Sequence, residues 1–247
     1  MTEKNLETTD IKPRKFFVTD IHGGYRSFLQ VLKLSNFNKE IDTLICGGDV
    51  VDGWPETVQL IDELLTIKNL ITIEGNHDSW CHEWLKFGVD PWIWTTQGGA
   101  ATIASYMGAP EKMPIHLTEY FNKMNLYYVD SDNNAFVHGG YKSKEGLGHN
   151  HKVDYTWDRT LWEKAKSAKK EVLNMSKMYN KVFIGHTSLG WPTLPQKKGN
   201  IWNLDTGGGW EGALTLMNID TEEYFMSDRV MDLYPEVKAM RGFKLEK

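Results

Sequence analysis

Cysteine and long apolar runs are both scarce in this chain of 247 residues. Its two cysteines, Cys46 and Cys81, are too few for a disulfide framework and are typical of a reducing compartment. No stretch reaches the roughly 18 consecutive apolar residues of a membrane-spanning helix, and the polar start "MTEKNLETTDIKPRK" lacks the apolar core of a secretory signal. The sequence therefore predicts a cytoplasmic protein without a membrane segment, in which Cys46 is a buried, unreactive thiol.

Arginine is scarce as well, and acidic residues outnumber basic ones. The formal net charge is -5, and only five of the 28 basic residues are arginines. A dedicated nucleic-acid binder would carry a basic face or stripe, so that class is disfavoured, although a nucleotide substrate is not. The lysine-rich segment 163–171 has acidic neighbours and helical spacing, which predict a solvated helix face.

The first ninety residues alternate between two patterns. Helical spacing of apolar residues at 25–34 and 55–67 separates three short apolar runs, at 15–20, 42–49 and 69–78. This alternation is typical of parallel strand–helix–strand units, in which ligands bind at the carboxyl ends of the strands. We therefore expect the polar turns "TDIHGG", "GGDVVDG" and "EGNHD" to meet at one edge of a sheet.

The rest of the chain is more varied. A tryptophan-rich segment at about 79–125 predicts an inserted cap, with most of its tryptophans in the core. A hairpin is expected around "SDNN" and a long helix over 158–179. Three more strands follow, in "KVFIGHT", "GNIWNLDTGG" and "GALTLMNIDTEEYFMS", and the charged tail from about 229 is expected to be loosely held.

Six residues of metal-ligand type lie at the ends of apolar runs. They are Asp20, His22, Asp49, Asn76, His138 and His186. One such residue alone indicates only a turn or a cap. Together they exceed the needs of one ion, and they suit two divalent ions about 3.5–4 Å apart that share a carboxylate. His77 lies in the turn "EGNHD", and the remaining four histidines, His82, His116, His149 and His151, lack this setting and are assigned to the surface or to packing.

The ordered motifs "DIH", "GDVVD", "GNHD", "VHGG" and "GHT" resemble the signature of the calcineurin-like metallophosphatases over about residues 14–228. The single histidine of "FIGHTS" resembles the phosphoprotein-phosphatase branch, which includes lambda phosphatase and small bacterial and phage serine/threonine phosphatases. The resemblance implies an α/β fold with a central β-sandwich flanked by helices, in four layers α/β/β/α. It also implies one domain over 1–247 with the cap at 79–125.

The resemblance assigns roles to individual residues. Asp20, His22 and Asp49 would bind one metal, and Asp49, Asn76, His138 and His186 the other. His77 would be the general acid, oriented by Asp52, and Arg159 would clamp the phosphate oxygens.

The activity implied is that of a phosphomonoesterase, with direct attack by a metal-bridging hydroxide. The expected substrates are phosphoproteins modified on serine or threonine, with phosphotyrosine or small phosphate esters as alternatives. Manganese is the first choice of metal, and iron, zinc, cobalt and nickel are alternatives.

One motif departs from the family. Its usual Gly-Asp-x-x-Asp-Arg-Gly reads "GDVVDGW" here, so Gly53 stands where a phosphate-binding arginine is expected. Arg26 follows the first metal loop, but a solvent-facing helix position is the favoured interpretation. Trp54 is a candidate for stacking on an aromatic or nucleoside group. We expect weaker phosphate anchoring and a broad substrate range.

Three alternatives stay open. The first is a dinucleoside-tetraphosphate hydrolase, since such enzymes resemble the same signature. The second is a phosphodiesterase, which is disfavoured by Ser188, where a second histidine would stand. The third alternative is a catalytically impaired metal-binding protein that recognises a partner through the tryptophan-rich cap.

Overall fold

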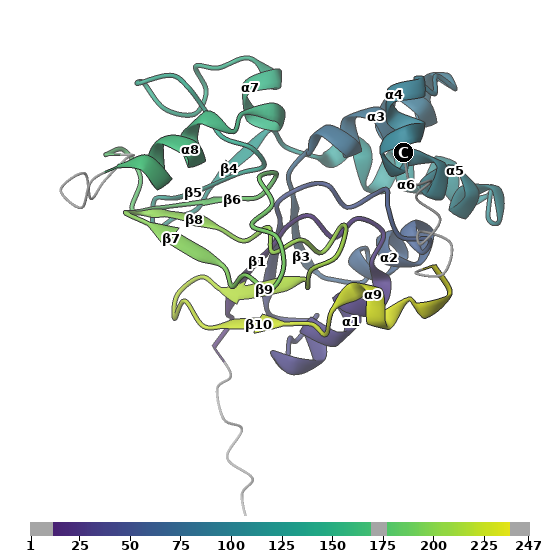
Figure 1. Cartoon of the computed structure of the whole chain (residues 1–247), viewed down its shortest axis with the longest axis horizontal. Coiled ribbons are helices and arrows are strands. Elements are labelled where there is room, and N and C mark those ends of the chain that lie inside the picture. Colours follow the sequence, from purple (N-terminus) through teal and green to yellow (C-terminus); the bar gives the residue numbers. More distant parts are fainter. Residues whose placement is uncertain (1–11, 169–176, 238–247) are drawn as a thin grey trace, which may run out of the picture.

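Two five-stranded β-sheets pack face to face with helices outside them (Figure 1). The computed structural model describes residues 12–168 and 177–237. The first sheet has the order β10-β9-β1-β2-β3, with β1 (Lys15–Val18), β2 (Thr43–Cys46), β3 (Asn69–Thr72), β9 (Thr215–Asn218) and β10 (Tyr224–Met226). Strands β1, β2 and β3 are parallel, which confirms the predicted strand–helix repeats.

The second sheet has the order β4-β5-β6-β8-β7. Its strands are β4 (Tyr127–Val129), β5 (Asn134–Val137), β6 (Lys181–Ile184), β7 (Gln196–Lys198) and β8 (Ile201–Asn203). Strands β5, β6 and β8 are parallel, and β4 and β7 pair antiparallel at the two edges. The antiparallel β4–β5 pair confirms the hairpin predicted around "SDNN".

Helices cover the sandwich on its outer sides (Figure 1). They are α1 (Tyr25–Leu34), α2 (Thr57–Leu64), α3 (Asn76–Phe87), α4 (Trp92–Trp94), α5 (Ala100–Met107), α6 (Lys112–Glu119), α7 (Lys152–Trp157), α8 (Thr160–Ser167) and α9 (Val230–Leu233). Two short turns complete the set, the π-helical η1 (Thr95–Gly99) and the 3-10 turn η2 (Phe121–Lys123). The α/β sandwich flanked by helices is the fold class predicted from the sequence, and it is confirmed.

Successive side chains of β1 point to opposite faces of the sheet, so this one strand packs against two different layers. Phe17 points between the sheets, where its ring centroid lies 5.6 Å from those of Phe136 and Phe183. Its neighbours Phe16 and Val18 pack instead in the cluster that contains Phe28 of α1. Full burial of a side chain of this size stabilises the fold by roughly 1.5–3 kcal/mol, so both faces of the sheet contribute.

The tryptophan-rich segment 79–125 contains most of α3 together with α4, α5, α6 and both short turns, and α5 packs against α2. Trp94 is fully buried, and Trp80 and Trp84 are half-buried. Trp92 is 80% exposed and is an exception to the expectation that most tryptophans of this segment lie in the core.

The later part of the chain corrects two expectations. The segment predicted as one last strand is a hairpin of β9 and β10. The helix predicted over 158–179 ends at Ser167, because Ala168 has an extended backbone with ψ 132°; residues 169–176 lie outside the described residues.

The tail is better packed than predicted over the part that the structure describes. Tyr234 is fully buried and stacks on Trp54 with ring centroids 5.0 Å apart. The prediction of a loose tail is therefore wrong for 229–237. Within the described ranges, no helix combines the length and apolar character needed to cross a bilayer.

Candidate active site

The polar turns of both sheets converge at the carboxyl ends of their strands. Asp20 and Asp49 lie just beyond β1 and β2, His138 and His186 lie just beyond β5 and β6, and Asn76 is the first residue of α3. Because these strands are parallel within each sheet and the sheets face one another, segments far apart in the sequence reach a single place.

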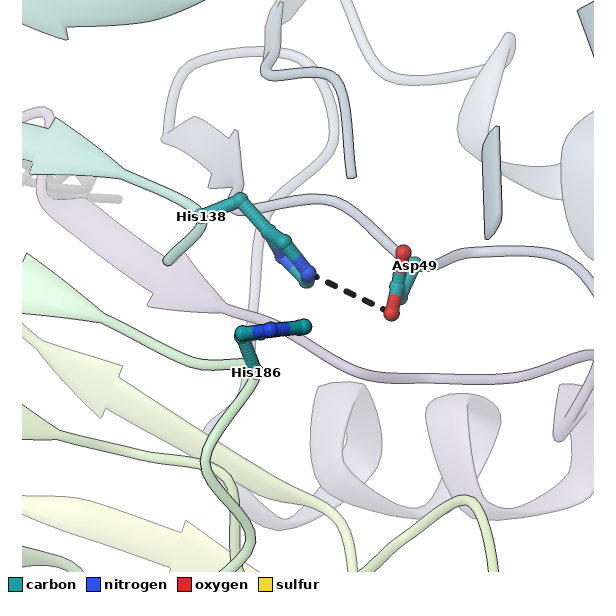
Figure 2. A group of neighbouring side chains, drawn as sticks. All are labelled: Asp49, His138 and His186. Carbon is teal, nitrogen blue, oxygen red and sulfur yellow. Dashed lines mark ion pairs between the residues drawn. The ribbon is translucent and has the colours of Figure 1, made fainter. Parts of the chain in front are cut away.

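Two groups of metal-ligand type share Asp49. One contains Asp20, His22 and Asp49, and the other contains Asp49, His138 and His186. In each group, one candidate donor atom per residue lies within 4.8 Å of the others. Figure 2 shows the side chains of the second group turned toward one another, with His138 Nε2 3.3 Å from Asp49 Oδ2. Asn76 joins this group, since its Oδ1 lies 3.2 Å from His138 Nε2.

Hydrogen bonds orient two of the imidazoles. His138 Nδ1 lies 2.9 Å from the Gly47 carbonyl oxygen and His22 Nδ1 lies 3.0 Å from that of Val51. In the neutral form of each ring, donation from Nδ1 to these carbonyls would leave the Nε2 lone pair available to a metal ion. His186 Nε2 is buried and has no hydrogen-bond partner among the described residues. A bound cation would satisfy it, so the donor set fits a metal site.

The charge state of the cluster suits cations as well. Burial lowers the pKa of His22 to about 4 and that of His186 to about 3, so both rings are neutral at pH 7. Burial disfavours charge on His138 too, but the Asp49 carboxylate raises its pKa to about 10. Burial alone would raise the pKa of Asp49, and His138 instead holds it well below its usual range. The cluster thus attracts a proton to His138, and a cation would neutralise the same negative charge.

His77 and Asp52 form a pair beside this cluster. His77 Nδ1 lies 2.6 Å from Asp52 Oδ2, which also accepts a hydrogen bond of 2.8 Å from Trp94 Nε1. Thr102 Oγ1 donates to the other carboxylate oxygen at 2.8 Å. Burial disfavours the charged imidazole, yet Asp49 and Asp52 raise the pKa of His77 to about 9. A ring that lines the pocket therefore holds a proton at neutral pH.

The backbone around the cluster is unusual. Eight non-glycine residues in the described ranges have positive φ, and five of them belong to this site: Asp20, His22, Asp49, Asp52 and His186. Left-handed conformations cost such residues of order 1 kcal/mol or more each, although Asp and His tolerate them better than most. Backbone strain is thus concentrated where the polar side chains meet.

Two glycines permit the close approach of the loops. A Cβ atom on Gly75 would lie 2.1 Å from Asp49 Oδ1, and one on Gly185 would lie 2.0 Å from Asp20 Oδ2. Any side chain at these positions would displace a carboxylate, so the glycines beside the motifs have a steric role.

A pocket of about 190 Å³ opens over the cluster. Besides candidate ligands and His77, it is lined by Gln97, Trp157, Arg159, Ser188, Asp205, Gly209 and Trp210. Arg159, predicted as a phosphate clamp, donates from Nη2 to the His186 carbonyl oxygen at 3.4 Å. The structure therefore brings all nine predicted site residues to one place.

Three further polar residues at this site were missed. Asp78 accepts hydrogen bonds from the backbone N–H groups of Asp49, Val50 and Gly75, at 2.7–3.0 Å, and so holds two metal loops together. Its place in the first turn of a helix after "GN" could have indicated a capping carboxylate. Asp205 follows the run "IWNL" and precedes "TGGG", which is the setting of the candidate ligands and could have indicated it, whereas Gln97 carries no comparable signal.

The two residues considered in connection with the arginine missing at position 53 lie outside the pocket. Trp54 is fully buried, and its Nε1 donates to the Gly208 carbonyl oxygen at 2.8 Å, so the idea that it stacks on a nucleoside is wrong. Arg26 pairs on the surface with Glu56 at 3.3 Å and Glu236 at 2.7 Å, as the solvent-facing interpretation expects.

The fold and this cluster define a metallophosphoesterase-like centre. Residues 14–219 match the model of the calcineurin-like phosphoesterase family, and the chain belongs to that family. The superfamily assignment made from the motifs is confirmed.

Individual relatives are more distant. A symmetrical bis(5'-nucleosyl)-tetraphosphatase of Buchnera aphidicola is 38% identical over 64 residues, which is 26% of this chain and 23% of that protein. An asymmetrical bis(5'-nucleosyl)-tetraphosphatase, PrpE, of Anoxybacillus flavithermus is 24% identical over 221 residues, covering 81% of this chain and 88% of that protein. Among solved structures, a putative diadenosine tetraphosphatase superposes with a TM-score of 0.63 at 17% identity, over 88% of this chain and 94% of that one. At this identity, the likeness shows the fold alone.

Proposed function

We propose that this protein is a dinuclear metal-dependent phosphoesterase that hydrolyses its substrate without a covalent protein intermediate. The observation that supports this most strongly is the position of Asp49, which belongs to both donor groups. A carboxylate shared in this way could bind two ions about 3.5–4 Å apart, as in two-metal sites.

In this proposal each residue has one role. The first ion is held by Asp20, His22 and Asp49, and the second by Asp49, Asn76, His138 and His186. When bound, two divalent cations would neutralise phosphate charge and lower the pKa of a bound water molecule. The mixed oxygen and nitrogen donors suit manganese, our first choice, as well as iron, zinc, cobalt or nickel.

His77 is proposed as the general acid. Its pKa of about 9 keeps a proton available for the leaving oxygen at neutral pH, while Asp52 fixes the orientation of the ring. Arg159 lines the same pocket and would bind phosphate oxygens through its planar guanidinium. We also propose that the chain is one domain in which 79–125 is a cap that contributes Gln97 to the pocket.

Two substrate classes are candidates. Dinucleoside tetraphosphates come first, since two relatives that match this chain carry that activity in their names. Phosphomonoesters, including phosphoproteins, come second, because the single-histidine motif "FIGHTS" resembles the phosphoprotein-phosphatase branch.

Hydrolysis by the metal-loaded protein tests the proposal. Diadenosine tetraphosphate, a phosphoserine peptide, p-nitrophenyl phosphate and a bis-aryl phosphodiester would be compared with and without Mn²⁺, and the products would be identified. We expect release of phosphate or nucleotide from at least one of the first three. Two bound ions per chain with no hydrolysis of any of them would instead support a metal-binding interaction protein.

The role of His77 is tested by His77→Asn. We expect kcat to fall by about 10²–10⁴-fold, because the leaving oxygen loses its proton donor. His149→Asn, which changes an exposed histidine outside the pocket, is the matched control and should keep full activity. Unchanged kcat in His77→Asn, with metal content equal to that of the parent protein, would contradict the assignment.

A further inference from the structure

A second groove adjoins the pocket over the metal-ligand cluster. It has a volume of about 300 Å³ and lies between α3 and α7. Asn76 and Trp157 line both this groove and the pocket, so the two lie side by side. A substrate that placed a phosphate at the cluster could therefore extend directly into the groove.

Indole rings dominate the inner end of the groove. Trp80 and Trp157 meet edge to face with centroids 5.3 Å apart. Trp80 also contacts the His77 ring, at 5.2 Å, and Trp157 contacts that of His186, at 5.8 Å. Since Trp157 remains 38% exposed, an aromatic surface is available within reach of the reacting end of a substrate.

The remaining lining is mixed in character. Val153, 57% exposed, adds an apolar surface from α7. Glu83 supplies acceptor oxygens, and Lys152 supplies a cation that is half exposed while it pairs with Glu74 at 2.5 Å. A flat ring with exocyclic amino groups fits this combination of aromatic, apolar and acceptor groups, and a cation beside it suits a phosphate chain.

We propose that the groove between α3 and α7 is a subsite for the nucleobase of a nucleoside polyphosphate, with the base stacked on the Trp80–Trp157 pair. This inference rests on the proposed hydrolytic function of the adjoining cluster and names the part of the substrate that extends away from it. Stacking of a base on aromatic side chains changes affinity by roughly tenfold or more. The subsite would thus distinguish nucleotides from phosphate compounds that lack a base.

Binding of adenosine to the metal-free protein tests the subsite apart from catalysis. Adenosine has no phosphate and no charge, so it reports on the groove alone. We expect it to shift the indole N–H signals of Trp80 and Trp157 in ¹⁵N-resolved NMR spectra, assigned through Trp80→Phe and Trp157→Phe. Val153→Asp should weaken this binding roughly fivefold or more, whereas Val89→Asp, the same change at a residue 53% exposed outside the groove, should not.

Kinetics provide a second readout. For the metal-loaded protein, Val153→Asp should lower the ratio of kcat/KM for diadenosine tetraphosphate to kcat/KM for inorganic tripolyphosphate by roughly tenfold. The added charge repels both substrates, so the ratio isolates the contribution of the base. Val89→Asp should leave the ratio unchanged.

The outcomes separate the two proposals. If no phosphate compound is hydrolysed but adenosine still shifts both indole signals, the hydrolytic function fails and the base-binding groove stands. If diadenosine tetraphosphate is hydrolysed while about 10 mM adenosine moves neither signal, the subsite is overturned and the function stands. Shifts produced by phosphotyrosine but not by adenosine would also overturn the nucleobase assignment.

Discussion

Residues of the candidate metal site have backbone conformations that few residue types adopt. Asp20, Asp49 and His186 all have positive φ, and Gly75 and Gly185 leave room for the two carboxylates. A strained backbone conformation persists only where the surrounding structure holds it in place. Here these conformations turn side chains from two sheets toward each other.

Gln97 lines the pocket, and the residue after it contacts Gly53, where the family's arginine is absent. It comes from η1, and the next residue, Gly98, accepts a hydrogen bond of 3.2 Å from the Gly53 backbone N–H. We predict that Gln97→Ala raises KM for a phosphate ester by roughly tenfold and leaves kcat nearly unchanged, since a neutral amide donor to a charged oxygen contributes about 1.5 kcal/mol.

Steady-state kinetics check this prediction. Gln196→Ala, in β7 outside the pocket, is the matched control and should behave as the parent protein does. A KM for Gln97→Ala equal to that of the parent would show that the side chain does not contact the substrate.

At the residue scale, the sequence indicated the candidate ligands more clearly than the residues that surround them. Asp20, Asp49 and His138 could be identified because each directly follows an apolar run. Gln97 could not, since it follows no strand and reaches the pocket from the segment 79–125. Trp54 was misassigned because its partner, Tyr234, lies 180 residues further along the chain.

At the scale of elements, an ion pair connects the start of the first sheet to α1. The buried Asp42 carboxylate accepts hydrogen bonds from Arg14 Nη2 at 2.6 Å and from the Asn38 backbone N–H at 2.9 Å. Arg14 in turn donates to the carbonyl oxygens of Ser35 and Asn36 at the end of α1. One carboxylate thus fixes the beginnings of β1 and β2 against the helix between them.

Asp42 gives a pH-dependent prediction. Burial alone would raise its pKa, but the hydrogen bonds from Arg14 and Asn38 lower the pKa below its usual value of 3.8. Because the folded state binds this proton less tightly than the unfolded state, the stabilisation is present above about pH 4 and is lost as the pH falls through the folded pKa. Asp42→Asn should lower the free energy of unfolding by about 1–3 kcal/mol at pH 7, with a smaller difference below pH 4.

Urea unfolding in the presence of a chelator measures this difference without a contribution from metals. Asp90→Asn, at an exposed position, is the control and should unfold as the parent protein does. A difference between Asp42→Asn and the parent that stays constant from pH 7 to pH 3 would contradict the account.

Elements with clear periodicity were predicted well, but one turn without glycine or proline was missed. The helix at 25–34 has the bounds expected of it, since its apolar spacing is regular. The segment containing β9 and β10 was predicted as one strand, because its turn "NIDTEEY" has neither glycine nor proline. There the reversal depends on Asn218, whose Oδ1 accepts hydrogen bonds from the Asp220 and Thr221 backbone N–H groups.

At the scale of the whole molecule, the fold creates the site by opposing two sheets. The first sheet supplies Asp20 and Asp49, and the second supplies His138 and His186. The donor group of Asp49, His138 and His186 therefore needs both sheets. The pairing of the two sheets could not be predicted from strand patterns, because it depends on contacts such as Phe17 with Phe136. It entered the sequence analysis only through the resemblance to a known family.

The number of metal ions bound per chain shows whether Asp49 joins two metal sites. Elemental analysis of Mn²⁺-loaded, desalted protein would compare the parent with Asp49→Asn, and Asp90→Asn would serve as the control. We predict two ions in the parent and the control and about one or none in Asp49→Asn, since both sites lose a charged ligand. Two ions in Asp49→Asn, or a single ion in the parent at saturating metal, would contradict the account.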